Sequence, residues 1–81
     1  MTVKFVVTDK RVIFGSIDYN YDSHSSVAQQ NGIPLSSVRG GGIADLAGKR
    51  IFGTSYGFGP YNPDIVRSFL PGWQVDQPAD Y

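Results

Sequence analysis

The chain has 81 residues, enough for one small domain, and its 41% hydrophobic content is typical of a packed globular protein rather than a disordered one. It has no cysteine, which excludes disulfides, thiolate metal sites and cysteine nucleophiles and is consistent with a cytoplasmic location. The formal net charge is zero and the seven basic residues are scattered along the sequence, so nucleic acid is not expected as a partner. No stretch approaches the roughly 20 apolar residues of a membrane span, so a membrane is not expected either.

The first predicted elements are two strands that form a hairpin. The first strand covers residues 3–8, and its odd positions are apolar and share one face: Val3, Phe5 and Val7. Lys4 lies on the opposite, more polar face, where a solvated lysine is the simplest interpretation and a phosphate contact is the alternative. A turn at residues 9–10 leads to a second strand, residues 11–17, that is rich in Val, Ile and Phe.

A short helix is predicted next, over residues 23–30. Asp22 and Ser23 are both good N-cap residues, and Ser26 with Gln29 offers a second, capping-box start. The Asn-Gly pair at residues 31–32 is a typical C-cap. His24, the only histidine in the chain, stands at the start of this helix, where unpaired N–H groups and the helix dipole favour an anion. Histidine is also suited to acid–base chemistry near neutral pH, although a lone histidine among serines is most often an ordinary surface residue.

A glycine-rich strand is predicted from residue 38, after a connector at residues 33–37, and it contains three consecutive glycines at residues 40–42. The triple glycine matches neither a P-loop nor a dinucleotide-binding fingerprint, because the residues that complete those motifs are missing. Flexible entry into the strand is the simplest interpretation. A turn is predicted at residues 44–48.

The following strand, predicted over residues 49–58, has the most informative pattern. Alternation places Ser55 on the same face as Gly53 and Gly57, so that this face is mostly bare backbone with one hydroxyl. A ligand could approach such a face closely and contact backbone N–H groups and the Ser55 hydroxyl. The alternative is that a helix packs tightly there or that the strand bulges.

The clearest helix follows, with Asn62 as N-cap and Pro63 at its first position. Its apolar stripe is predicted to pack on the sheet and consists of Ile65, Val66, Phe69 and Leu70. A Pro-Gly pair ends the helix, and residues 73–75 are predicted to form a last short strand. The order of elements predicts one α+β domain over residues 1–81, with a single mixed or antiparallel sheet of about five strands and two helices.

Three segments carry a resemblance to a known family. They read RGGGI at residues 39–43, KRIFGTSYGFGP at residues 49–60 and LPGWQV at residues 70–75. A triple glycine, a strand that ends in Gly-x-Ser-x-small-aromatic-Gly-Pro, a helix and a final strand together resemble the pattern of the phosphohistidine phosphatase (janus) family. The resemblance covers residues 39–75 and implies a janus-like fold.

The resemblance also implies roles for individual residues. Lys4 resembles the active-site lysine of the family and His24 its catalytic histidine, which acts as base or nucleophile. Ser55 and Gly57 resemble the positions whose hydroxyl and backbone N–H hold the phosphate. The implied substrate is a phosphorylated protein or a small phosphoramidate, and the family's enzymes work without a metal.

Three more residues are candidates for phosphate contacts. Ser23 and Ser25 lie at the predicted start of the first helix, although the family usually has a tyrosine where this chain has Ser23. The family also has an arginine directly after the triple glycine, where this chain has Ile43. Arg39 shares strand parity with that position but lies about 13 Å back along a regular strand, so it could supply the charge only if the strand bends at the glycines.

A non-catalytic module that binds an anion or a protein on the same scaffold is the alternative function. The missing arginine favours it, and so do six amphipathic aromatic residues of a kind enriched at interfaces: Tyr19, Tyr21, Tyr56, Tyr61, Trp73 and Tyr81. A homodimer is one assembly that such residues would support. No metal or other cofactor is expected, because one histidine and scattered aspartates do not supply a zinc-type ligand set.

Overall fold

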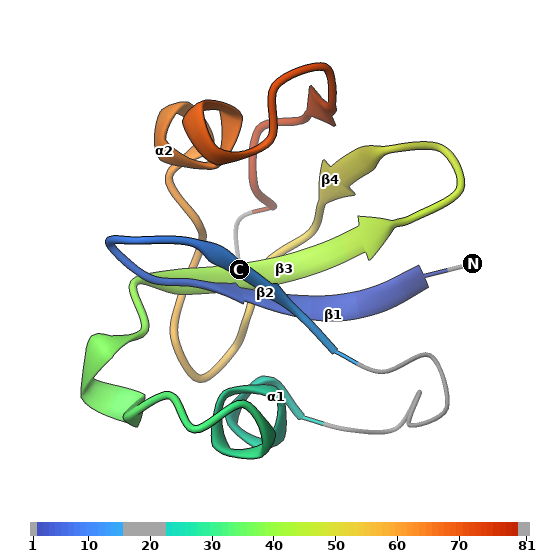
Figure 1. Ribbon diagram of the computed structural model, residues 1–81. Helices are drawn as coiled ribbons and strands as arrows, with labels where there is room; N and C mark the ends of the chain where they lie inside the picture. Colours follow the sequence, from blue (N-terminus) through green and yellow to red (C-terminus); the bar gives the residue numbers. More distant parts are fainter. Residues whose placement is uncertain (1, 16–22, 80–81) are drawn as a thin grey trace.

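The computed structural model describes residues 2–15 and 23–79. They form an α+β fold with one five-stranded mixed sheet and two α-helices, which confirms the predicted fold class (Figure 1). In chain order the elements are β1 (Thr2–Val7), β2 (Val12–Phe14), α1 (His24–Gln30), a short 3-10 helix η1 (Leu35–Ser37), β3 (Gly40–Asp45), β4 (Arg50–Phe52), α2 (Pro63–Phe69) and β5 (Gln74–Val75). The strand order is β2-β1-β3-β4-β5, and every pair is antiparallel except β4–β5, which is parallel.

The two helices cover opposite faces of the sheet (Figure 1). On the α2 side, the odd positions of β1 join a core that contains Val3, Phe5, Val7, Ala44, Ile51, Tyr61, Val66 and Val75. On the α1 side a smaller core contains Val6, Ile13, Val27 and Ala28. The predicted alternation of β1 is therefore confirmed, and it explains why Lys4 projects toward α1.

The triple glycine is required by close packing rather than by flexible entry into the strand. A Cβ atom at Gly41 would lie 2.6 Å from the carbonyl oxygen of Phe5 and 2.9 Å from Cδ2 of His24. On the other face, a Cβ atom at Gly42 would lie 3.0 Å from the ring of Phe5 and 3.1 Å from the ring of Tyr61. Side chains at these positions would displace backbone or rings, so the glycines let α1 and the aromatic core approach β3.

The start of α2 follows its local sequence signals. The side chain of Asn62 accepts hydrogen bonds from the N–H groups of Asp64 (2.9 Å) and Ile65 (3.4 Å), and Pro63 occupies the first helical position. Val66 is fully buried, and Phe69 and Leu70 pack against the core. The prediction that Ile65 is also buried is wrong, because this residue is 40% exposed.

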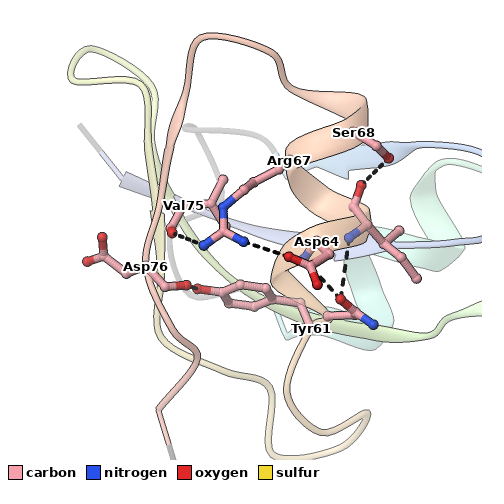
Figure 2. Close-up of polar contacts among 8 residues, drawn as sticks. Tyr61, Asp64, Arg67, Ser68, Val75 and Asp76 are labelled. Carbon is pink, nitrogen blue, oxygen red and sulfur yellow. Dashed lines mark hydrogen bonds and ion pairs between the residues drawn. The ribbon is translucent and has the colours of Figure 1, made fainter.

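Polar contacts connect α2 to the segment around β5 (Figure 2). The hydroxyl of Tyr61, a residue in the core, donates to the carbonyl oxygen of Asp76 at 2.7 Å. Arg67 donates to the carboxylate of Asp64 at 2.8 Å and to the carbonyl oxygen of Val75 at 3.2 Å. Burial raises the pKa of Tyr61 to about 12, which keeps its hydroxyl protonated as a donor.

Several predicted strand boundaries need correction. β1 covers residues 2–7 rather than 3–8, β2 ends at residue 14, and β5 covers residues 74–75 rather than 73–75. β4 ends at Phe52 instead of continuing to residue 58, because the chain turns at Gly53 (φ +77°). β3 begins at residue 40 rather than 38 and runs to residue 45, so the turn before β4 covers residues 46–49. β2 begins at residue 12 rather than 11, and residues 16–17 of the predicted strand lie outside the described part.

The aromatic residues expected at an interface are in different environments. Tyr61 is buried in the core, and Trp73 stacks on Phe14 with ring centroids 5.6 Å apart. Tyr56 is 87% exposed. The others lie outside the described residues: Tyr19, Tyr21 and Tyr81.

In residues 2–15 and 23–79, neither helix has the length and apolar character needed to cross a bilayer.

Candidate functional site

A cleft of about 470 Å³ opens on the α1 side of the sheet, between the start of α1 and the turn that follows β4. Six of the seven predicted site residues line it: Lys4, Ser23, His24, Ser25, Ser55 and Gly57. Four further residues complete its described lining: Ile43, Thr54, Tyr56 and Phe58. The fold thus brings together side chains from β1, α1, β3 and the residues after β4.

His24 is the first residue of α1, and its partly buried ring lies against Gly41. Its Nε2–H donates to the carbonyl oxygen of Gly42 at 2.9 Å, which assigns the proton of the neutral ring to Nε2 and the lone pair to Nδ1. The pKa of His24 is lowered from its usual value, and burial of the ring is the largest cause. The bond to Gly42 opposes this shift and the charge of Lys4 adds to it. The imidazole is therefore neutral at pH 7.

Lys4 projects from β1 into the same cleft, directly beside Ile43 in the β1–β3 register. Among the described lining residues, Lys4 is the only one with a basic side chain. The described lining therefore places an apolar side chain directly beside this basic one.

The turn at residues 55–59 forms the wall opposite α1. Ser55 is fully buried; its Oγ accepts a hydrogen bond from the N–H of Phe58 (3.2 Å) and its carbonyl oxygen accepts one from Gly59 (2.8 Å). The Ser55 hydroxyl therefore helps to hold the turn, and its proton remains available to donate to a ligand. Gly57 lies exposed at the tip of the turn, where a Cβ atom would meet nothing within 4 Å.

Thr54 was not predicted as a site residue. Among the described residues, its Oγ1 is the one buried side-chain oxygen or nitrogen without a hydrogen-bond partner. Strand alternation assigned Thr54 and Ser55 to opposite faces, but the chain turns at Gly53 and both residues line the cleft. The sequence has no signal for this arrangement beyond the glycine itself. A buried hydroxyl without a partner is unfavourable in the free protein and is a candidate ligand contact.

The two serines at the start of α1 have local partners. Ser23, one of the predicted candidates, is the N-cap, and its Oγ accepts from the N–H of Ser26 at 3.2 Å. The same oxygen is 2.9 Å from Oγ of Ser25 and 3.1 Å from Oγ of Ser26. These hydroxyls mainly cap the helix, even though Ser23 and Ser25 also line the cleft.

Arg39 is not brought to this cleft. Its guanidinium lies beside Asp9, with Nε and Nη2 each 3.2 Å from a carboxylate oxygen, and it lines a different cavity. The strand therefore does not bring the guanidinium of Arg39 to the side of Lys4 and Ile43.

In the described part of the chain, no three His, Cys, Asp or Glu residues gather as a metal site would require. Comparisons of the chain with protein-family models, with curated proteins and with solved structures find no match in any of the three.

Proposed function

We propose that the cleft at His24 binds a phosphoryl group and that His24 promotes metal-independent hydrolysis of phosphohistidine or a related phosphoramidate. The observation that carries the proposal is that the imidazole of His24 and the side chain of Lys4 line one cleft together with the turn after β4. These are the residue types that the janus resemblance implies for this reaction. The proposal joins that resemblance to the geometry of the cleft.

The charge and the donors of the cleft suit a phosphoryl group. Lys4 supplies a positive charge, and the Thr54 and Ser55 hydroxyls and the Gly57 N–H are donors from one short segment. Donors that are fixed before the reaction stabilise charge that develops on the phosphoryl oxygens, and such stabilisation is usually the largest contribution to the rate. Because Thr54 Oγ1 has no partner in the free protein, a bound oxyanion would satisfy it after a rotation about χ1.

The protonation state of His24 suits a base or a nucleophile. At neutral pH its Nδ1 has a lone pair, because Nε2 holds the proton and donates to Gly42. As a base, Nδ1 takes a proton from a water molecule while the water oxygen attacks phosphorus, the P–N bond breaks, and the leaving nitrogen takes up a proton. As a nucleophile, Nδ1 itself attacks phosphorus while the P–N bond of the substrate breaks and the leaving nitrogen takes up a proton. Water then cleaves the new bond between phosphorus and Nδ1 and releases phosphate.

A phosphate-binding module without turnover is the second candidate. The observation that favours it is the position of Ile43, which lines the cleft beside Lys4 where the janus pattern has an arginine. Without that guanidinium, one fewer cation stabilises the transferred phosphoryl group. Binding would then persist, because it needs fewer contacts than catalysis does.

The test is the release of phosphate from a phosphohistidine peptide in the presence of a chelator. We expect the wild-type protein to be active, His24→Ala to be inactive, and Lys4→Gln to be about 10- to 100-fold slower, as expected for a lost charge contact to the transition state. Lys49→Gln removes a charge from the exposed β3–β4 turn and should leave the rate unchanged. Full activity of a folded His24→Ala protein would overturn the proposal.

Two further measurements separate the alternatives. A phosphoryl group on His24, detected by mass spectrometry after alkaline quenching, would distinguish the nucleophile from the base. An inactive wild-type protein that still binds phosphate at His24 would support the non-catalytic module. In that case Ile43→Arg, which places a guanidinium beside Lys4, is the variant expected to gain activity.

A further inference from the structure

A second cleft, of about 340 Å³, lies between the β1–β2 turn and η1. Its described lining contains three of the seven basic residues of the chain, namely Lys10, Arg11 and Arg39. The only acidic residue in that lining is Asp9, so the cleft has a formal charge of +2 (three cations and one anion) in a chain whose net charge is zero. The basic residues that are scattered in the sequence are thus partly gathered by the fold.

The backbone around this cleft is held in place by hydrogen bonds. Oγ1 of Thr8 accepts from the N–H groups of Lys10 (3.1 Å) and Arg11 (3.2 Å), which fixes the turn that carries two of the cations. The N–H of Arg39 donates to the carbonyl oxygen of Val7 at 2.7 Å and holds the third cation alongside this turn. The cations are therefore presented by an ordered backbone rather than by free chain ends.

The charges in this cleft are only partly neutralised. Asp9 accepts two hydrogen bonds from Arg39, one from Nε and one from Nη2, so its carboxylate is already used. No ion pair within the described part of the chain engages Lys10 or Arg11. Two cationic groups therefore face this cleft without an anionic partner.

The other walls suit an anion that is attached to a carbon skeleton. Ser36 and Ser37 supply hydroxyl groups from η1, and Ile33 and Pro34 supply an apolar surface. Arginine and lysine with nearby hydroxyls are the usual partners of phosphate groups, whose charge of about −1.5 to −2 at pH 7 matches that of the cleft.

We propose that this second cleft binds a phosphate monoester group. It is separate from the cleft at His24: Lys4 on β1 lines the first cleft, and Thr8, which directly follows β1, lines the second, four residues or about 13 Å further along the extended chain. The proposal depends on neither the resemblance to phosphatases nor any activity at His24. Because the cationic residues are exposed, we expect weak binding that declines as the salt concentration rises.

The experiment is a ¹H–¹⁵N NMR titration of the full chain with three probes: inorganic phosphate, an uncharged peptide that carries one phosphoserine, and the same peptide without phosphate. We expect the amides of Ser36, Ser37 and Arg39 to shift with the phosphopeptide but not with the unphosphorylated peptide. His24 reports the first cleft in the same spectra. A stronger response to the phosphopeptide than to phosphate supports a modified protein as the ligand, and an equal response supports a small phosphate compound.

Single variants show whether the cleft itself is responsible. Lys10→Gln and Arg11→Gln should each weaken binding about three- to tenfold, as expected for exposed charge contacts. Lys49→Gln removes the same charge elsewhere on the surface and should have no effect. Equal weakening by Lys49→Gln would mean attraction to net charge alone and would overturn the proposal. Shifts confined to the first cleft, or no shifts at all, would also overturn the proposal.

Discussion

Replacing Thr54 by valine is expected to stabilise the free protein, the opposite of the usual effect of a substitution at a partly buried residue. Oγ1 of Thr54 is buried and has no hydrogen-bond partner among the described residues. Such a hydroxyl destabilises a folded protein by about 1–3 kcal/mol, and valine has nearly the same shape without the polar atom. We therefore expect Thr54→Val to raise the free energy of unfolding by about 1–2 kcal/mol, and the melting temperature by about 4–8 °C per kcal/mol.

The assay is urea unfolding followed by the fluorescence of Trp73, which stacks on Phe14 in the folded protein. Thr8→Val is the matched control, because Oγ1 of Thr8 accepts two backbone hydrogen bonds and the same substitution should destabilise by about 1–3 kcal/mol. Phosphate should bind the Thr54→Val protein about tenfold more weakly, because the ligand loses one hydroxyl donor. An unchanged or lower unfolding midpoint for Thr54→Val would mean that the hydroxyl is satisfied in the free protein, and the reasoning about Thr54 would fail.

Three other predictions concern the packing and the pH dependence. Tyr61→Phe removes the hydroxyl that donates to the Asp76 carbonyl and should lower the free energy of unfolding by about 1 kcal/mol. An unchanged urea midpoint would mean that this hydrogen bond does not stabilise the fold. Val66→Ala should lower the free energy of unfolding by about 2–3 kcal/mol and Ile65→Ala by less than about 1 kcal/mol, because only Val66 is fully buried. If Ile65→Ala lowers the urea midpoint more than Val66→Ala does, the described orientation of α2 is wrong. The pKa of His24 is lowered from 6.5 in the folded state, so the unfolded chain binds the proton more readily. The free energy of unfolding should therefore fall as the pH drops below 6.5. If a His24→Gln protein shows the same pH dependence, His24 is not its cause.

The helices were predictable because their signals are local. Ser23 caps α1 as expected, and the Asn62-Pro63 pair begins α2 where the sequence indicates. The Pro-Gly pair likewise follows the end of α2. A cap needs only residues within one helical turn, so a single sequence contains the information.

The errors share a different cause, since they depend on backbone turns or long-range contacts. Alternation continued β4 past Phe52, but Gly53 adopts φ +77° and ends the strand, which also hid the position of Thr54 in the cleft. Tyr61 was counted among surface aromatics because nothing local indicates that its hydroxyl reaches the backbone of Asp76. Composition and periodicity do not record such contacts.

The residues of the two clefts show the same contrast between what the sequence indicates and what long-range contacts decide. Lys4 and His24 were candidates from their positions in the predicted strand and helix, the family resemblance implied catalytic roles for them, and the fold does bring them to one cleft. Arg39 was assigned to that cleft by strand parity, yet it pairs with Asp9, 30 residues earlier, and lines the second cleft. Which distant residues meet is decided by the strand order, and the scattered basic residues gave no indication of it.

The proposed function requires that phosphate binds at His24, and an NMR titration of the His24 ring and the Gly57 amide with phosphate measures this binding. We expect both signals to shift together in one saturable transition, bound phosphate to raise the pKa of His24, and Lys4→Gln to weaken the binding. The amide of Arg39 reports the second cleft separately in the same spectra. If the His24 and Gly57 signals stay fixed at millimolar phosphate, the cleft is not a phosphate site and the proposed function is wrong.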